Sequence, residues 1–273
     1  MSDPDAVRAF EHAGWQVAAA GYEASFATAT RPFIPALLDR AGIGSGQTVL
    51  DVACGPGFTA AAAAGRGAAA RGLDFSAAML AVARERHPGL VFDQGDAEAL
   101  PYADAAFDAV VSNFGIHHAP NPVNALADAG RVLRPGGRLA FTVWADQGSN
   151  IAWKLVFDAI RTRGDMTASK APPPGGGLND PDACLSAMAR AGLVEGAVVH
   201  VRHVWRHPDG AALLTALRSG TARMAALIGA QTPEALAAIA AEIDVRAASH
   251  RDAQGLGVPI AAFVVSGRRD GRA

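Results

Sequence analysis

The sequence predicts a doubly wound α/β fold, in which helices cover both faces of a mostly parallel sheet. Short apolar runs alternate with helical segments from residue 47 to residue 145. Alternation at this spacing is typical of parallel strands joined by crossover helices. Glycine, aspartate and asparagine residues follow the apolar runs, at the strand ends where open α/β sheets bind ligands. The length of 273 residues fits one such domain with helical additions.

The first elements are helices over residues 5–42. Proline is tolerated in the first turn of a helix, so Arg31-Pro32 starts the second helix. Ser76 and Asn121-Pro122 start two later helices, and Pro135-Gly136-Gly137 ends the second of these. Five strands are expected, over residues 48–53, 68–74, 90–95, 107–114 and 138–145.

The pattern becomes less regular after residue 148. Residues 151–163 are predicted to be helical and residues 172–177 to be a flexible link. The remaining expected elements are a helix from Asp180-Pro181 to Gly192, a strand at 198–205, helices at 209–229 and 232–249, and a strand at 259–267.

Charge and cysteine content exclude several classes of protein. There are 24 basic and 26 acidic side chains and no basic stripe, so a nucleic-acid partner is not expected. Cys54 and Cys184 match no metal-ligand spacing, and such sparse cysteine indicates a reducing compartment. The N-terminus lacks the apolar region of a signal peptide, and no apolar run approaches the roughly 18 residues that span a bilayer. We therefore expect a cytoplasmic protein without a membrane partner.

The glycine turn after the first strand also fits a dinucleotide-binding dehydrogenase. Gly55, Gly57 and Ala60 satisfy the pattern GxGxxA, and Asp74 stands where such proteins bind a ribose. Pro56, however, removes an N–H group that a pyrophosphate would use. Asp51 occupies a segment that is apolar in dinucleotide sites, and Asp96 has no role there. The sequence therefore favours a different ligand.

Four ordered motifs resemble those of class I S-adenosylmethionine-dependent methyltransferases. They are VLDVACGPG, GLDFSAAML, GDAEALPYADAAFDAVVSNFGIHH and RVLRPGGRL. They are similar above all to the subgroup that contains the ubiquinone and menaquinone C-methyltransferases. The likeness covers about residues 45–145. It implies S-adenosylmethionine as cofactor and a seven-stranded sheet of order 3-2-1-4-5-7-6 whose last strand is antiparallel.

The resemblance also implies roles for residues at matching positions. Asp51 would lie near the amino group of the cofactor, and the turn Cys54–Gly57, with Gly55, would pass under its methionine part. Asp74 would bind the ribose, and Asn113 and Phe114 would lie near the sulfonium. The adenine would be contacted by Phe75, Met79, Asp96 and the backbone of Ala97. The aspartates also fit turns or helix caps, Cys54 fits a small turn residue, and Met79 fits the core.

The acceptor side is less defined by the sequence. His117 and His118 follow the fourth strand, and either fits a general base or a structural residue. Tyr22 is expected to close over the cofactor. Further candidate walls of the acceptor pocket are Trp15, Phe26, Trp144 and the 209–249 helices. No metal is expected, since His200 and His203 are three residues apart and point to opposite faces of a strand.

We therefore expect one methyltransferase domain over residues 1–273. It would comprise a helical cap at 1–44, a cofactor-binding core at 45–148, and helical lid insertions at about 149–180 and 207–255. The expected reaction is methyl transfer to an O, N or C atom of a small organic molecule. Three alternatives remain: cyclisation or aminocarboxypropyl transfer with the same cofactor, a non-catalytic cofactor-binding protein, and the NAD-dependent dehydrogenase. A homodimer is left open.

Overall fold

The computed structural model describes residues 3–146, 148–173, 177–178 and 180–271. Part of the expected 172–177 link lies outside these residues. Within them, one sheet of eight strands has the order β3-β2-β1-β4-β5-β8-β6, and the short β7 pairs with β8. The strands are β1 (Thr48–Val52), β2 (Ala69–Asp74), β3 (Val91–Gln94), β4 (Phe107–Asn113), β5 (Leu133–Trp144), β6 (Leu193–His207), β7 (Arg251–Asp252) and β8 (Gly255–Arg269).

The topology confirms the predicted order of the sheet. Strands β1 to β5 pair in parallel, and β8 lies antiparallel between β5 and β6. The strand predicted as the seventh is β8. The sequence did not reveal β7, a two-residue strand that pairs with the start of β8. Such a short strand carries no alternation of apolar and polar residues from which it could be recognised.

Eleven α-helices and three 3-10 turns are found in the described part of the chain. They are α1 (Pro4–Tyr22), α2 (Ala27–Thr30), η1 (Arg31–Phe33), α3 (Ile34–Ala41), α4 (Phe58–Gly65), α5 (Ala77–Arg86), η2 (Ile116–His118), α6 (Pro122–Val132), α7 (Ile151–Arg163), α8 (Pro181–Arg190), α9 (Gly210–Gly220), α10 (Ala222–Gly229), α11 (Pro233–Arg246) and η3 (Ala248–His250).

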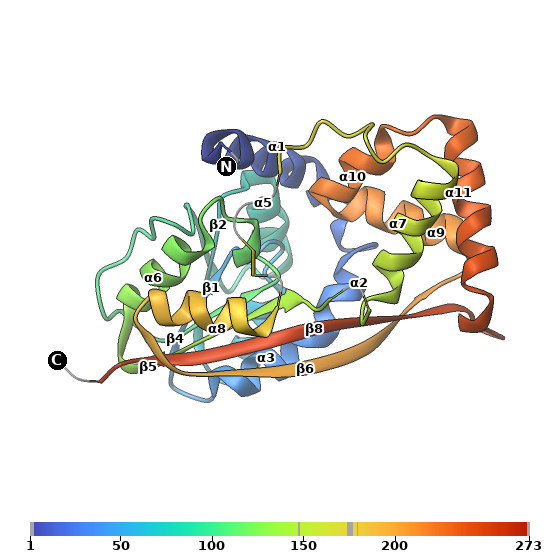
Figure 1. Ribbon diagram of the computed structural model, residues 1–273. Coiled ribbons are helices and arrows are strands. Elements are labelled where there is room, and N and C mark those ends of the chain that lie inside the picture. The colour runs from blue at the N-terminus through green and yellow to red at the C-terminus, as the bar shows by residue number, and fades with distance from the viewer. Residues whose placement is uncertain (1–2, 147, 174–176, 179, 272–273) are drawn as a thin grey trace.

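Helices cover both faces of the sheet, as expected (Figure 1). On one face, Leu37 and Leu38 of α3 pack with Val49 and Val111 of the sheet. On the other face, α6 and α8 pack against the alternate strand residues, which include Leu50 and Val110. Successive strand residues point to opposite faces, so each central strand contributes to both cores. These two cores fix the strand ends that form the site.

Two boundaries differ from the sequence predictions. The expected 209–229 helix is broken at Thr221, which has the extended dihedral angles φ −137° and ψ 154°. Here Gly220 packs so closely on Phe26 that a Cβ atom at Gly220 would lie 2.4 Å from the Phe26 Cβ. The helix expected to end at Pro135 ends instead at Val132, and β5 begins at the next residue. Both shifts depend on contacts with distant segments.

Strands β6 and β8 are much longer than predicted, with 15 residues each. They run past the parallel strands and carry the second half of the chain to a group of helices (Figure 1). Strand β6 lies at the edge of the sheet, where Val199 and Val204 stay exposed. The polar residues of an edge strand break the apolar run on which the prediction depended.

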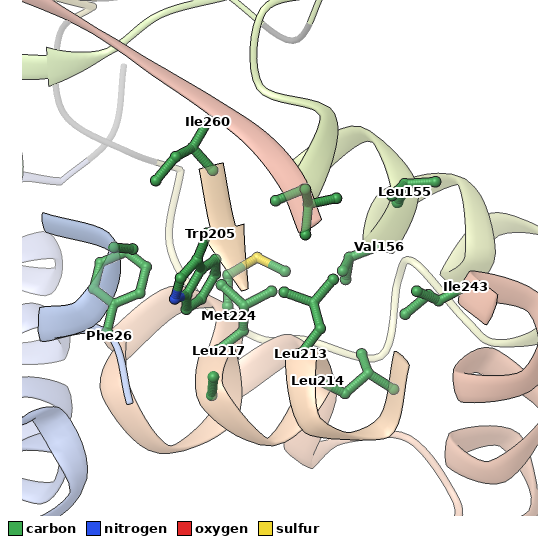
Figure 2. Packing of buried hydrophobic residues seen from close by; sticks show 14 of the residues in the cluster. Phe26, Leu155, Val156, Trp205, Leu213, Leu214, Leu217, Met224, Ile243 and Ile260 are labelled. Carbon is green, nitrogen blue, oxygen red and sulfur yellow. The ribbon is translucent and has the colours of Figure 1, made fainter. Parts of the chain in front are cut away.

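Helices α7, α9, α10 and α11 enclose a separate core at the end of β6 and β8. Trp205 of β6 is 2% exposed and is surrounded by Phe26, Leu217 and Met224 (Figure 2). The indole Nε1 donates a hydrogen bond to Thr28 Oγ1 over 2.7 Å. Burial of one large apolar side chain contributes about 1.5–3 kcal/mol, so this core holds the helical group to the sheet and to the N-terminal segment.

No single helix of the described residues is long and apolar enough to cross a bilayer. The pair α10 and α11 has the length and composition of a span only when the two helices are taken together, and they are bent by 116° relative to each other.

Candidate cofactor site

A cavity lies at the carboxyl ends of β1, β2 and β4, beneath helix α1. Its empty volume is about 980 Å³, including the part open to solvent. Ten of the predicted cofactor residues line it: Tyr22, Cys54, Gly55, Asp74, Phe75, Met79, Asp96, Ala97, Asn113 and Phe114. Asp51 and Gly57 do not line it and lie behind its wall. The structure thus brings together residues from four strand ends that are far apart in the sequence.

The floor of the cavity is the glycine turn between β1 and α4. Gly55 and Gly57 have φ angles of 51° and 82°, in the left-handed region that glycine adopts without steric cost. A Cβ atom at Gly57 would also lie 2.7 Å from Phe92 Cζ. Gly57 therefore shapes the turn from behind and makes no wall of the cavity. The burial of the Cys54 thiol raises its pKa well above the usual value, so Cys54 is an unreactive turn residue.

Asp74 stands at the end of β2 and faces this turn. Its Oδ2 accepts a hydrogen bond from Gly55 N and its Oδ1 accepts one from Ser76 N, both over 2.8 Å. The side chain is buried, and this burial raises the pKa of Asp74 to about 6 despite the two backbone donors. A carboxylate has about four acceptor positions, so two remain for donors in the cavity.

Asp51 is buried beneath the same turn. Its Oδ2 accepts a hydrogen bond from Ala60 N over 2.9 Å, whereas Oδ1 is buried without a partner among the described residues. Burial, together with the nearby charge of Asp74, raises the pKa of Asp51 well above its usual value. A buried acceptor without a partner is costly. Through its bond to Ala60 N, Asp51 holds the first turn of α4 from below the glycine turn.

Asp96 follows β3 and already has a basic partner. It forms an ion pair with Arg8 of α1, and its Oδ1 accepts a hydrogen bond from Glu98 N over 2.9 Å. Ala97 lies beside it on the cavity wall. The sequence did not reveal the ion pair, because Arg8 and Asp96 come from elements that only the fold brings together.

Asn113 and Phe114 form the cavity wall at the end of β4. Asn113 Nδ2 donates to Thr30 O over 3.2 Å, and Asn113 Oδ1 accepts from Thr142 Oγ1 over 2.8 Å. Phe114 stacks on Trp144 with their ring centroids 4.0 Å apart. These contacts, from α2 and β5, fix both side chains.

Helix α1 forms the roof of the cavity. Gln16 Oε1 accepts from Ser76 Oγ over 2.7 Å and from Ala78 N over 2.8 Å, which ties α1 to the start of α5. Met79 is buried between α1 and α5 and also reaches the cavity. Tyr22 OH lies 3.0 Å from Thr30 Oγ1, and burial raises its pKa to about 12. The phenol therefore stays neutral.

The two histidines after β4 have different surroundings. His118 lines the cavity, and its Nδ1 lies 3.1 Å from Glu11 Oε2. His117 is not in the cavity wall; its Nδ1 is buried without a partner in the described residues, and burial lowers the pKa of His117 well below its usual value. The geometry therefore favours His118, rather than His117, as the histidine that contacts a bound molecule.

The predicted acceptor walls are only partly in place. Trp15 and Tyr22 line the cavity. Phe26 and Trp144 instead pack on each other and on Trp153 in an aromatic cluster. Helices α9 to α11 supply no lining residue among those described. The cavity is therefore bounded on this side by aromatic packing.

Several residues that line the cavity were not predicted from the sequence. Arg31 is exposed at the rim, with its guanidinium 4.6 Å above the Phe58 ring, and has no carboxylate partner among the described residues. Arg8, Glu11 and Thr30 also line the cavity. All four precede the first strand, in a segment without a motif. The only sequence signal was the group of polar residues along predicted N-terminal helices.

Comparison with known proteins relates part of the chain to one family. Residues 50–141 match the family model described as a methyltransferase domain. The demethylmenaquinone methyltransferase of Renibacterium salmoninarum is 44% identical over 110 residues, which cover 40% of this chain and 46% of that protein. The enzyme of the same name from Beutenbergia cavernae is 44% identical over 104 residues, covering 38% and 43%. The chain thus spans less than half the length of these curated relatives.

Solved structures show the same fold over most of the chain. The YcgJ protein from Bacillus subtilis has a TM-score of 0.56 and 17% identity, with 88% of this chain and 100% of that chain covered. Phosphoethanolamine N-methyltransferase 2 of Haemonchus contortus, solved with S-adenosylhomocysteine, has a TM-score of 0.54 and 18% identity, with 88% and 53% covered. Residues 50–141 therefore match a methyltransferase domain, and the fold of the described chain is that of these solved structures.

Proposed function

We propose that this chain transfers a methyl group from S-adenosylmethionine to an O, N or C atom of a small organic molecule. The main support for this proposal is the environment of the Asp74 carboxylate. The carboxylate is fixed by Gly55 N and Ser76 N and keeps two acceptor positions at the cavity wall. Two adjacent hydroxyl groups of a ribose supply the two donors that this arrangement needs.

The other wall residues fit the remaining parts of the cofactor. The guanidinium of Arg31, which has no carboxylate partner among the described residues, suits the carboxylate of the cofactor. We assign Phe75, Ala97 and Asp96 to the adenine and Asn113 and Phe114 to the sulfonium; all five residues line the cavity, which supports this assignment. The bound cofactor would supply a methyl group on an electrophilic carbon.

The chain's own contribution to such a reaction is positioning and exclusion of water. Asn113 and Phe114 are held by Thr30, Thr142 and Trp144, so the wall beside the methyl group is rigid. Alignment of two reactants at near-attack distance contributes up to about 7–11 kcal/mol in model reactions. Helix α1 covers the cavity and limits the access of water.

Isothermal titration calorimetry and a product assay test this proposal. S-adenosylmethionine and S-adenosylhomocysteine should bind with measurable heat, whereas NAD should not. The purified protein is then incubated with methyl-labelled cofactor and a metabolite panel. Demethylmenaquinone is included as the first acceptor, because the curated relatives are named for it. No heat with either sulfur ligand would overturn the proposal.

A second outcome for the same cofactor also needs a test. One solved structure of the same fold, with a TM-score of 0.53 and 20% identity, is named the [4+2]-cyclase SpnF, so the fold by itself does not define the reaction. S-adenosylhomocysteine as product indicates methyl transfer. Methylthioadenosine indicates attack at another carbon of the cofactor.

The proposal extends to the organisation of the chain and to its partners. The helical segments at 1–44, 149–180 and 207–255 are proposed to act as cap and lid around the core at 45–148. The net charge of −2 and the lack of a basic stripe support the absence of a nucleic-acid partner, and the two cysteines support a reducing compartment such as the cytoplasm. A homodimer is a further possibility that light scattering of the purified chain tests directly.

A further inference from the structure

Three separate elements meet at Glu11 of helix α1. The Glu11 side chain is 1% exposed, and its Oε2 accepts a hydrogen bond from Trp15 Nε1 over 3.0 Å. The same oxygen lies 3.1 Å from His118 Nδ1 of η2. Its other oxygen, Oε1, accepts from Arg223 Nε of α10 over 2.6 Å. A carboxylate buried this deeply is retained only where such partners offset the loss of water.

The carboxylate stays ionised in this setting. His118 and Arg223 outweigh the effect of burial and lower the pKa of Glu11. An ionised carboxylate can only accept hydrogen bonds. The contact with His118 therefore requires a proton on Nδ1, and in a neutral imidazole the lone pair is then on Nε2.

His118 keeps its second nitrogen available. No partner for Nε2 is found among the described residues, and the side chain is 24% exposed and lines the cofactor cavity. Trp15 packs edge-to-face on the imidazole, with centroids 5.0 Å apart, and limits its rotation. His117 has no carboxylate partner of this kind in the described structure, and it is outside the cavity wall. Only one of the two adjacent histidines is thus oriented by an acidic group.

We infer that Glu11 is a positioning residue that holds His118 in the Nδ1–H tautomer, so that Nε2 takes a proton from the acceptor. This inference rests on the proposed function and narrows its substrate class. The acceptor is a protic nucleophile, such as a hydroxyl group, an N–H group or an acidic C–H group. A tertiary amine or a thioether has no proton to lose and would not need this pair.

The proposed step balances in atoms and charge. The acceptor X–H gives its proton to Nε2 of His118, and X forms a bond to the methyl carbon. The bond between that carbon and the sulfonium sulfur breaks, and the electron pair stays on sulfur, so a neutral thioether leaves. Imidazolium beside the Glu11 carboxylate then returns its proton to water.

Nuclear magnetic resonance on histidine labelled with ¹⁵N tests the tautomer without any acceptor. His118 is assigned by loss of its signals in His118→Gln, and spectra are recorded at a pH where the imidazole is neutral. The wild-type protein should carry the proton on Nδ1. In Glu11→Gln, a neutral amide with one acceptor oxygen faces three donors, from Arg223, Trp15 and His118, so the acceptor that holds the proton on Nδ1 is weakened. The share of the Nε2–H tautomer should then rise.

Glu242→Gln is the matched control. Glu242 of α11 has a side chain only 12% exposed and accepts from two arginines, Arg163 and Arg246, but it is not a wall residue of the cavity. It should leave the His118 tautomer unchanged. A proton on Nε2 in the wild-type protein would overturn the inference, and this measurement requires no variant of Glu11 to fold. The same tautomer in wild type and in folded Glu11→Gln would also overturn it.

A kinetic arm tests the substrate class. With an acceptor found in the labelled-cofactor screen, Glu11→Gln should lower kcat at least tenfold, since a general base contributes about 10²–10⁴-fold. KM for the cofactor should change less than about twofold. The loss should shrink for an acceptor analogue that is already ionised at the assay pH, whereas equal losses would contradict proton removal. If no methyl transfer is found, the proposed function fails. The tautomer measurement still shows whether Glu11 holds the proton on Nδ1 of His118.

Discussion

Replacing Asp74 by asparagine separates cofactor binding from folding. The native carboxylate accepts one backbone N–H on each oxygen, from Gly55 and Ser76. Asparagine has the same shape but only one acceptor oxygen, and its amide nitrogen must face a donor. The change therefore removes a buried charge and one hydrogen bond at the same time.

These two effects oppose each other in the free energy of unfolding. The shift of the Asp74 pKa from its ordinary value near 3.8 to about 6 corresponds to about 3 kcal/mol that the buried charge costs above pH 6. A hydrogen bond to a charged acceptor contributes about 1.5–3 kcal/mol. Asp74→Asn should thus change the free energy of unfolding by less than about 1.5 kcal/mol at neutral pH.

Cofactor affinity has no such compensation. The carboxylate offers both free acceptor positions to the ribose, and asparagine loses at least one of these charge-assisted bonds. A loss of about 1.5–3 kcal/mol raises the Kd for S-adenosylmethionine about 10- to 150-fold. Asp74→Asn should therefore be a folded protein with weak cofactor binding.

Urea unfolding and titration calorimetry at neutral pH measure the two quantities on one preparation. Asp108→Asn is the control, because Asp108 also accepts a backbone N–H, from Thr48 over 2.7 Å, but is not a wall residue of the cavity. It should lose stability and keep the cofactor Kd. A Kd for Asp74→Asn within twofold of the wild type would refute the assignment of Asp74 to the ribose.

Three further outcomes are expected. Cofactor affinity should fall as the pH drops below about 6, because protonated Asp74 accepts fewer hydrogen bonds. Calorimetry from pH 5 to 8 checks this, and a cofactor Kd that does not change with pH contradicts it. Gly115→Ala places a Cβ 2.4 Å from Ala53 Cβ. It should lower the free energy of unfolding, measured in urea, by about 1–3 kcal/mol and weaken cofactor binding. An unchanged unfolding midpoint contradicts this. Cys54 and Cys184 are buried, and burial raises both thiol pKa values, so Ellman's reagent should react only after unfolding.

The pH dependence of stability follows from the same carboxylate. Because burial raises the pKa of Asp74, the native state binds this proton more tightly than the unfolded state does. The contribution of Asp74 to the free energy of unfolding therefore falls as the pH rises from about 4 to about 6. Below that window both states are protonated, and the buried charge costs nothing. Asp74→Asn should remove this part of the pH dependence.

The parallel half of the fold could be predicted because its signals are local. Each of the first five strands is an apolar run of a few residues, and the helices between them begin at caps such as Ser76, whose Oγ accepts from Met79 N over 3.2 Å. The glycine turn and Asp74 are adjacent to their strands in the chain. Strand order then brings them together without any further information.

The second half depends on contacts that no local pattern encodes. The break between α9 and α10 results from the packing of Gly220 on Phe26, nearly 200 residues earlier in the chain. The full length of β6 results from pairing with β8, which continues to His207 and Leu256. A sequence window around either position contains no trace of its partner.

The same distinction separates the two sides of the cavity. The cofactor side is built from strand ends within residues 50–141, where the chain matches its relatives. The side that would receive an acceptor is bounded by Glu11, Trp15 and Tyr22 of α1, and Arg223 of α10 braces Glu11. These residues lie outside the matched region. We therefore expect selection of the acceptor to depend on contacts between the N-terminal helix and the helical group, so substitutions there should change the acceptor while leaving cofactor affinity in place.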